Sequence, residues 1–278
     1  MIKIDTHQHF WKYDPEQLPW INEDMAVLKN DYLPPDLKAE MDKAKVDGCV
    51  AVQAVQSEEE TNFLLDLAEE YDYIKGVVGW VDLQDFSVKS RLAHFSKYPK
   101  MKGVRHIVQD EPDDEFLLDP DFMKGVKALP EFDLSYDLLI FEHHLPVALQ
   151  FVSFLPGCRL VVDHLAKPLI ARGELTPWQQ NMRSLGRYQN VHCKLSGMVT
   201  EADWENWKPE DFTAYLDVAF ESFGPEKLML GSDWPVCTLA AEYTEVMEVF
   251  DRFMEQFSEE EKTMIYGQNA IDFYKLDV

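Results

Sequence analysis

The chain has 278 residues, 46% of them hydrophobic and 28% charged, which allows a large buried core in one α/β barrel or in two ordinary domains. The 51 acidic and 26 basic side chains give a formal charge of -25, which disfavours nucleic acid and anionic membranes as partners. No apolar run approaches the roughly 18 residues of a membrane span, and the first residues indicate a strand rather than a signal peptide, so we expect a cytoplasmic protein.

Eight short segments rich in β-branched and apolar residues are predicted to be strands. They span residues 2–7, 46–55, 74–83, 101–108, 132–140, 159–165, 191–196 and 228–233. Most of the gaps carry apolar residues three or four positions apart, which predicts helices at 37–45, 59–71, 88–98, 145–154, 178–188 and 212–223. Two further helices are expected at 241–257 and 260–274, the second capped by Ser258 with Glu261 three residues later.

Strand alternating with helix predicts a parallel sheet. Eight such units favour a single (β/α)8 TIM barrel over an open doubly wound sheet, and no linker divides residues 1–278 into two domains. No glycine-rich phosphate-binding motif follows any strand, so a nucleotide would lack its usual cradle. The four cysteines show no CxxC spacing and are expected to be buried free thiols. They are Cys49, Cys158, Cys193 and Cys237.

Two connections, residues 10–35 and 197–209, are longer than a barrel needs and are rich in aromatic side chains. Both should leave the C-terminal ends of their strands, which is the face where barrel enzymes place their chemistry. Side chains such as Trp11, Trp20 and Met198 would either contact a substrate there or only pack the loops down. The sequence leaves these two interpretations open.

His7 and His9 occupy positions i and i+2 of the first predicted strand, so both rings leave the same face. The other polar residues at predicted strand ends are Arg105, His106, Asp163, His164, Lys194 and Asp233. If they converge at a barrel mouth, His7, His9, His164 and Asp233 could hold a zinc or manganese ion. Without a metal, the three imidazoles would donate hydrogen bonds to a carbonyl oxygen while Asp233 takes a proton from water.

Several strings resemble the amidohydrolase superfamily: His-Gln-His at 7–9, Asp-His-Leu-Ala-Lys-Pro at 163–168 and Gly-Ser-Asp-Trp-Pro at 231–235. Within that superfamily the chain is similar to the amidohydrolase-2 group of sugar lactonases, such as L-fuconolactonase and L-rhamnonolactonase. Segments 103–113 and 193–202 carry the same similarity, which extends from His7 to about Tyr274.

The resemblance implies a catalytic set of His7, His9, His164 and Asp233, with Asp233 as the general base. It also implies at most one divalent ion, zinc before manganese. Binuclear members of the superfamily use a lysine-derived carbamate at strand four and a histidine at strand five, whereas this chain has Arg105 and His106 at strand four and no histidine at residues 135–137. Related dicarboxylate-lactone hydrolases are thought to need no metal, so a metal-independent enzyme is the alternative.

The predicted substrate-binding residues are Arg105, His106, Lys194, Trp11, Trp20, Met198 and Trp234. A period of two lets only one of Arg105 and His106 face inward, and Arg105 would bind lactone oxygens as a fork of donors. Lys194 should also reach the pocket. Alternatively, Arg105 and Lys194 only pair with a carboxylate such as Asp163, which is expected to point away from His164 and to act as a supporting residue.

The predicted reaction is hydrolysis of a small-molecule substrate, a sugar-derived lactone such as L-fucono- or L-rhamnonolactone, to the aldonic acid. Asp233 would activate water, and Asp233 or a neighbour such as His106 would protonate the ring oxygen as it leaves. Two alternatives remain: a metal-dependent decarboxylase of an aromatic or muconate-like acid, and a non-catalytic ligand-binding barrel. The sequence does not decide whether the protein is a homodimer.

Overall fold

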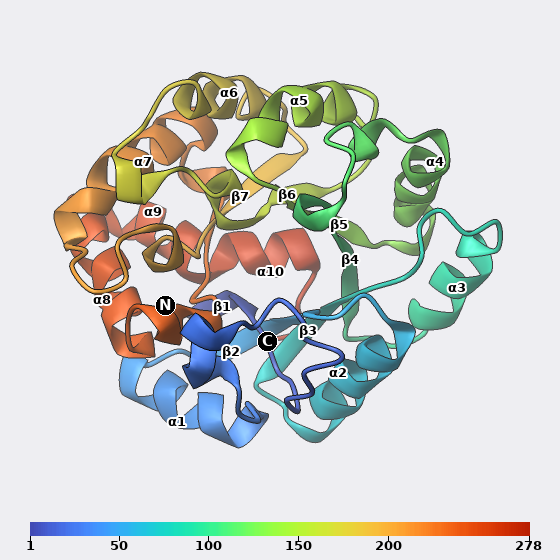
Figure 1. Cartoon of the computed structure of the whole chain (residues 1–278), viewed down its shortest axis with the longest axis horizontal. Coiled ribbons are helices and arrows are strands. Elements are labelled where there is room, and N and C mark those ends of the chain that lie inside the picture. The colour runs from blue at the N-terminus through green and yellow to red at the C-terminus, as the bar shows by residue number, and fades with distance from the viewer.

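The computed structural model describes residues 1–278 and contains eight parallel strands that follow one another around a central axis (Figure 1). They are β1 (Ile4–Gln8), β2 (Gly48–Val52), β3 (Ile74–Gly79), β4 (Met101–Ile107), β5 (Ser135–Leu139), β6 (Leu160–Val162), β7 (Val191–Leu195) and β8 (Leu228–Leu230). Beside β8 and β1, the His9 N–H donates to the Trp234 carbonyl at 2.7 Å and the Asp233 N–H donates to the His7 carbonyl at 2.8 Å. These bonds join the first and last strands, and the predicted (β/α)8 barrel is confirmed.

Helices between the strands form an outer ring (Figure 1). They are α1 (Pro34–Ala44), α2 (Glu58–Glu70), α3 (Val88–Phe95), α4 (Pro120–Ala128), α5 (Leu145–Ser153), α6 (Trp178–Leu185), α7 (Pro209–Phe223) and α8 (Tyr243–Met254). The sequence analysis missed α4. The sequence does carry a helix-start signal there, an aspartate followed by a proline. In the structure Asp119 is the N-cap and accepts hydrogen bonds from the N–H groups of Asp121 and Phe122, and the proline occupies the first helical position.

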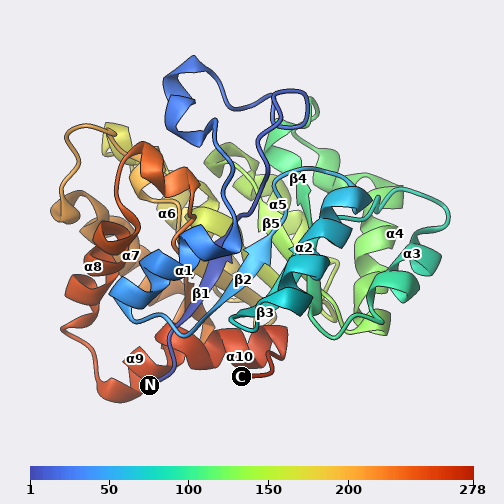
Figure 2. The same cartoon turned by 90° about the horizontal axis from the view of Figure 1, so that it is seen from below.

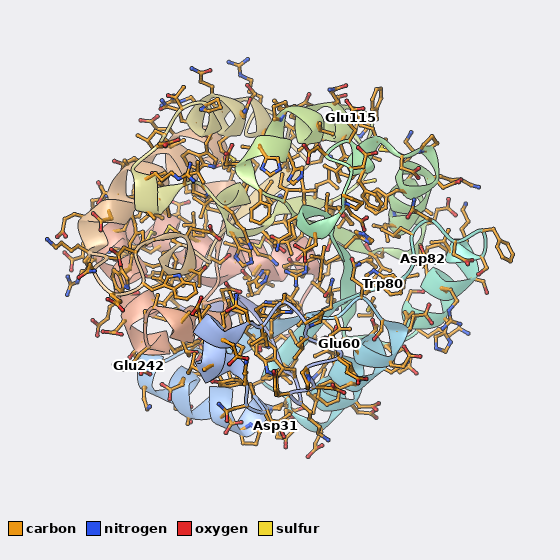
Figure 3. The ribbon with its side chains drawn as sticks, viewed as in Figure 1. Asp31, Glu60, Trp80, Asp82, Glu115 and Glu242 are labelled. Atoms are coloured by element: carbon orange, nitrogen blue, oxygen red, sulfur yellow. The ribbon has the colours of Figure 1, made fainter.

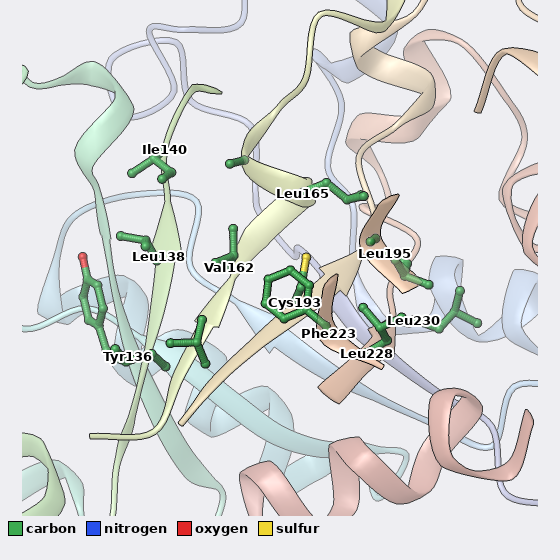
Figure 4. Packing of buried hydrophobic residues seen from close by; sticks show 14 of the residues in the cluster. Tyr136, Leu138, Ile140, Val162, Leu165, Cys193, Leu195, Phe223, Leu228 and Leu230 are labelled. Atoms are coloured by element: carbon green, nitrogen blue, oxygen red, sulfur yellow. The ribbon is translucent and has the colours of Figure 1, made fainter. Parts of the chain in front are cut away.

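The outward faces of the strands pack against this ring of helices. On β5 and just beyond it, Tyr136, Leu138 and Ile140 alternate with inward residues and are fully buried in the largest apolar cluster. Figure 4 shows these side chains beside their counterparts on β6, β7 and β8, such as Val162 and Cys193. The inward positions are thereby left for the polar residues of the barrel interior. All four cysteines are buried and free, as predicted.

The N-terminal ends of the strands are closed by the last part of the chain (Figure 2). Helices α9 (Glu259–Thr263) and α10 (Asn269–Tyr274) are joined by a π-helical turn where one helix was predicted. The predicted cap is present, since the Ser258 hydroxyl accepts from the Glu261 N–H at 3.3 Å. In α10, Phe273 and Tyr274 pack with inward residues such as Ile4 and Val161.

The opposite end of the barrel is the mouth, where the long connection after β1 projects beyond the strands (Figure 2). The predicted strands 159–165 and 228–233 are too long, because β6 ends at Val162 and β8 at Leu230. The backbone instead turns left-handed at His164 (φ 51°) and at Asp233 (φ 61°). Turns rather than strands therefore place these two side chains.

No helix in the structure has both the length and the apolar character needed to cross a membrane.

Candidate active site

A cavity of about 290 Å³ opens at the mouth and is lined by His9, Arg105, His164 and Asp233, among others. Asp233 lies at the centre of the polar group. Its Oδ1 atom is 3.4 Å from His9 Nε2, 3.8 Å from His164 Nε2 and 4.0 Å from His7 Nε2. The structure thus brings together the four side chains that the sequence singled out, although they come from a strand end and two left-handed turns.

The second nitrogen of each ring at the mouth is held by the protein. His9 Nδ1 donates to the Val52 carbonyl at 2.8 Å, and His164 Nδ1 lies 2.9 Å from the Ser196 hydroxyl. Gly197 adopts φ 64°, and a Cβ atom there would lie 2.5 Å from His164 Nδ1, so only glycine fits beside this ring. These contacts direct both Nε2 atoms toward Asp233.

His7 lies deeper and is fully buried. Its Nδ1 atom is 3.3 Å from Asp163 Oδ1 and 3.2 Å from the Lys194 ammonium, while its Nε2 atom is 3.2 Å from the Arg105 guanidinium. Because Arg105 can only donate, a neutral ring accepts at Nε2 and carries its proton on Nδ1. Asp163 Oδ1 is then the acceptor, and the Lys194 ammonium is a close neighbour that does not donate to the ring. Asp163 therefore faces inward and fixes the orientation of His7.

The electrostatics favour neutral imidazoles around an ionised carboxylate. Burial lowers the pKa of His164 to about 4 and holds the pKa of His7 well below its ordinary value. Burial alone would raise the pKa of Asp233, but the neighbouring His164 and His9 outweigh it and the pKa is lowered. At neutral pH the site therefore offers a base, not an acid, at Asp233.

Lys194 lies beneath the cavity and does not line it. The ammonium, fully buried, is 2.6 Å from Asp137 Oδ2 and 3.0 Å from Asp163 Oδ1. The Tyr274 hydroxyl of α10 donates to the same Asp137 oxygen at 2.7 Å. The structure therefore shows Lys194 paired with carboxylates, including Asp163, which was the alternative to its binding the substrate.

Arg105 faces the cavity and His106 faces away, so one of the two is inward, as period-two geometry predicts. Arg105 donates to Asp163 Oδ2 at 3.3 Å and to the Gln53 carbonyl, and its buried Nε–H has no partner in the protein. His106 Nε2 lies 2.7 Å from Glu111, and its ring packs outside the barrel strands on the ring of Phe116. The structure does not bring His106 to the site.

The large apolar residues expected near the substrate divide between the two roles that the sequence left open, contact with the cavity and packing of the loops. Trp20 and Trp204 line the cavity. Trp11, Trp234 and Met198 are no more than 4% exposed and pack the loops and core instead. Trp11, for example, donates from its indole N–H to the Asn30 carbonyl at 3.0 Å.

A family model described as amidohydrolase matches residues 4–276. The chain belongs to the amidohydrolase family. The L-fucono-1,5-lactonase of Burkholderia multivorans is 41% identical over 286 residues, covering 99% of this chain and 96% of the relative. The L-fucono-1,5-lactonase of Burkholderia ambifaria is 34% identical with the same coverage.

A solved structure of an amidohydrolase from Burkholderia multivorans with bound zinc matches this amidohydrolase with a TM-score of 0.97. The two chains are 41% identical, and the match covers 100% of both. These relatives confirm the family that the sequence strings indicated. They also give a reason to ask whether the residues of this chain fit a metal ion.

The ligand atoms of this amidohydrolase fit one divalent ion. His7, His164 and Asp233 offer ligand atoms that all lie within 4.8 Å of one another, and His9 Nε2 is 3.4 Å from Asp233. Ligands about 2.0–2.2 Å from one tetrahedral zinc ion lie roughly 3.3–3.6 Å apart. The His9 distance from Asp233, 3.4 Å, falls in this range, and the His164 and His7 distances, 3.8 and 4.0 Å, exceed it slightly. The held second nitrogens of the histidines are the usual support of metal ligands. The donor set is therefore compatible with a metal without requiring one.

Sequence reasoning missed several residues that line the cavity of this amidohydrolase. They include Lys167, Glu201 and Gln109. Each lies inside a string that carried the family resemblance: Lys167 in 163–168, Glu201 in 193–202 and Gln109 in 103–113. The polar members of those strings were the available signal, because they come directly after strands whose ends form the mouth.

Proposed function

We propose that this amidohydrolase opens a sugar-derived lactone to the aldonic acid, with L-fucono-1,5-lactone as the first candidate substrate. The observation that carries the proposal is an ionised Asp233 at the mouth of a cavity, beside the neutral imidazole of His164 and 3.4 Å from His9 Nε2. Two curated relatives that cover almost the whole chain are L-fucono-1,5-lactonases. They do not favour the decarboxylase or the non-catalytic barrel.

In the proposed reaction, Asp233 accepts a proton from water as the water oxygen bonds to the lactone carbonyl carbon. The carbonyl oxygen becomes an oxyanion, which needs donors that are in place beforehand. Of the side chains that line the cavity, we assign this role to the Arg105 guanidinium and the His164 imidazole, because a neutral His9 ring donates its one N–H to the Val52 carbonyl. Removing one such donor typically costs about 10² to 10³ in rate.

A divalent ion, with zinc the first choice and manganese the second, would be held by His7, His9, His164 and Asp233. When bound, it would polarise the lactone carbonyl and make water easier to deprotonate. The protein's own contribution is to orient the four side chains, through Val52, Ser196 and Asp163 on the histidines.

The cavity has two chemically different walls, which suits a neutral polyhydroxylated ring. One wall, next to β1, β2 and β8, is a single apolar cluster to which Trp20, Met25, Ala54, Val236 and Leu239 belong. The other, next to β4 to β7, is mixed: its polar side chains stand among the apolar Ile107, Leu139, Phe141 and Trp204, and they are Gln109, Asp110, Lys167, Thr200 and Glu201. A sugar lactone has apolar carbon faces for the first wall and hydroxyl groups for the second.

The test is a pH-indicator assay of the purified protein against a panel of L- and D-aldonolactones, because opening the lactone releases a proton. We expect rapid acid release from a stereochemically related subset that includes L-fucono-1,5-lactone. The same assay after chelation, and again after zinc is added back, reports whether a metal is required. No turnover across the panel, together with carbon dioxide release from an aromatic acid, would contradict the lactonase and support the decarboxylase.

A further inference from the structure

Opening a lactone turns its ring oxygen into a leaving alkoxide, and this oxygen needs a proton. Most titratable groups that line the cavity are unsuited to donate it. Asp233 is occupied with water, and the Nε2 atoms of His9 and His164 face Asp233. The Arg105 guanidinium does not give up protons in proteins. His106, the sequence-based candidate, is turned away from the cavity.

Asp110 is exposed at the rim, so the remaining candidates are Lys167 and Glu201, and the backbone at Lys167 is unusual. Four consecutive residues, from His164 to Lys167, have left-handed φ angles of 51°, 53°, 57° and 47°. None is glycine, and such residues cost roughly 1 kcal/mol or more each in this conformation. The segment is held in place because the Trp178 indole donates to the Leu165 carbonyl at 2.7 Å, and both Leu165 and Ala166 are fully buried.

This left-handed segment brings both of its end residues to the cavity. Its first residue, His164, lies beside Asp233, and its last residue, Lys167, lies on the wall of the same cavity. Backbone strain that the surrounding structure maintains is found mostly at functional sites. The segment therefore links the position of the lysine to that of the catalytic histidine.

The surroundings of Lys167 hold its ammonium without consuming its protons. The nitrogen lies 3.9 Å from Glu201 Oε1 and 5.2 Å from the centre of the Phe141 ring. At 3.9 Å the contact with Glu201 is an ion pair rather than a hydrogen bond, so the N–H groups remain available to a ligand in the cavity. Burial raises the pKa of Glu201 above its ordinary value, Lys167 opposes this, and the charge of Asp233 adds to it.

We propose that Lys167 is the general acid that protonates the leaving ring oxygen, and that Glu201 is the residue that positions it. This inference rests on the proposed lactone hydrolysis. As the bond between the carbonyl carbon and the ring oxygen breaks, the oxygen keeps the electron pair and takes a proton from Lys167 Nζ. The neutral amine regains a proton from solvent, and Asp233 returns the proton it took from water. The balance is one lactone and one water converted to a hydroxy acid.

The sharpest test compares Lys167→Arg and Lys167→Met with wild type on the aldonolactone that the wild type hydrolyses fastest. Arginine keeps the positive charge but has no transferable proton. We therefore expect both variants to lose about 10²-fold in kcat, with the KM of Lys167→Arg within roughly threefold of wild type. Adding methylammonium should restore part of the rate to Lys167→Ala in proportion to its concentration.

Lys124→Arg, on the exposed face of α4, is the matched control and should retain wild-type kinetics. If Lys167→Arg keeps the wild-type kcat, or if its loss appears in KM alone, the lysine only binds substrate through its charge and the inference is overturned. A wild type that hydrolyses no lactone would instead contradict the proposed function, so the two failures are distinguishable.

Discussion

Two groups of charged side chains inside the barrel use the same residue types for different purposes. The sealed group, Asp137, Asp163 and Lys194, is completely buried and is covered from the closed end by Tyr274. The open group consists of Asp233 with its histidines and lines the cavity. The sealed group pairs two carboxylates with an ammonium, whereas the open group surrounds one carboxylate with imidazole rings.

The comparison shows how the partners of a buried carboxylate decide its use. Burial alone would raise the pKa of Asp163, but Lys194, His7 and Arg105 outweigh it and hold the pKa well below its ordinary value. The pKa of Asp137 is raised, because burial and the charge of Asp163 outweigh Lys194. These two acids have fixed partners and support the fold, while Asp233 contacts only rings and remains free to accept a proton.

The largest expected effect is on the open group. Asp233→Asn should reduce kcat/KM by about 10⁴-fold, because an amide cannot take a proton from water. The fold should be retained, because asparagine tolerates the left-handed backbone at this position as well as aspartate does. Steady-state kinetics and a melting curve check both parts, with Asp217→Asn on the exposed side of α7 as the control. A variant that keeps more than a tenth of the activity would refute Asp233 as the base.

A substitution in the sealed group should lower the free energy of unfolding. Lys194→Met leaves the buried Asp137 without a cation and Asp163 with Arg105 alone, and removing one partner of a buried ion pair typically costs about 3 to 5 kcal/mol of unfolding free energy. Urea denaturation measures this loss. The same substitution at the exposed Lys124 should change stability by no more than about 0.5 kcal/mol. Equal stability of the two variants would mean that the sealed group is not held by its charges.

A third carboxylate sharpens the comparison, because Glu60 at the start of α2 accepts N–H groups from Ala54 and Val55 but contacts no cation. Figure 3 shows it nearer the barrel axis than Asp31, Glu115 and Glu242. Burial raises its pKa to about 7 from the ordinary 4.5. A raised pKa means that the folded state binds the proton more tightly, so this contribution is complete below pH 4.5 and is lost as the pH rises through 7.

Between pH 5 and pH 8, wild type should therefore lose about 1 to 2 kcal/mol more unfolding free energy than Glu60→Gln, after allowance for the partial exposure of the carboxylate. Denaturant titrations of both proteins at the two pH values provide the measurement. The other titrating groups are the same in both proteins and cancel in the difference. Parallel pH dependence would show that Glu60 is ionised throughout.

Much of the site was predictable because it depends on local spacing. His7 and His9 were expected on one face. His9 lines the cavity and His7 lies deeper, and a single carboxylate lies within 4.0 Å of both Nε2 atoms. The approximate ends of most strands followed from composition. The strings around Lys167 and Glu201 marked the right segments without revealing which side chains would enter the cavity.

The remaining features could not be predicted, because they depend on contacts between distant segments. The left-handed turns at His164 and Asp233 have no glycine to announce them, and the buried environment alone maintains them. Only the folded chain shows that Lys194 meets Asp137, 57 residues away, instead of a substrate. The folded chain also decides which tryptophans reach the cavity, since Trp20 lines it and Trp234 is buried.

The sequence by itself determined the eight-stranded barrel, the family and the histidine and aspartate types of the site, because alternation of strand and helix and short polar strings are local properties. The tertiary structure alone decided which charges are sealed and which are open. It did so because the pKa and direction of a buried side chain depend on what the other strands bring within about 4 Å of it.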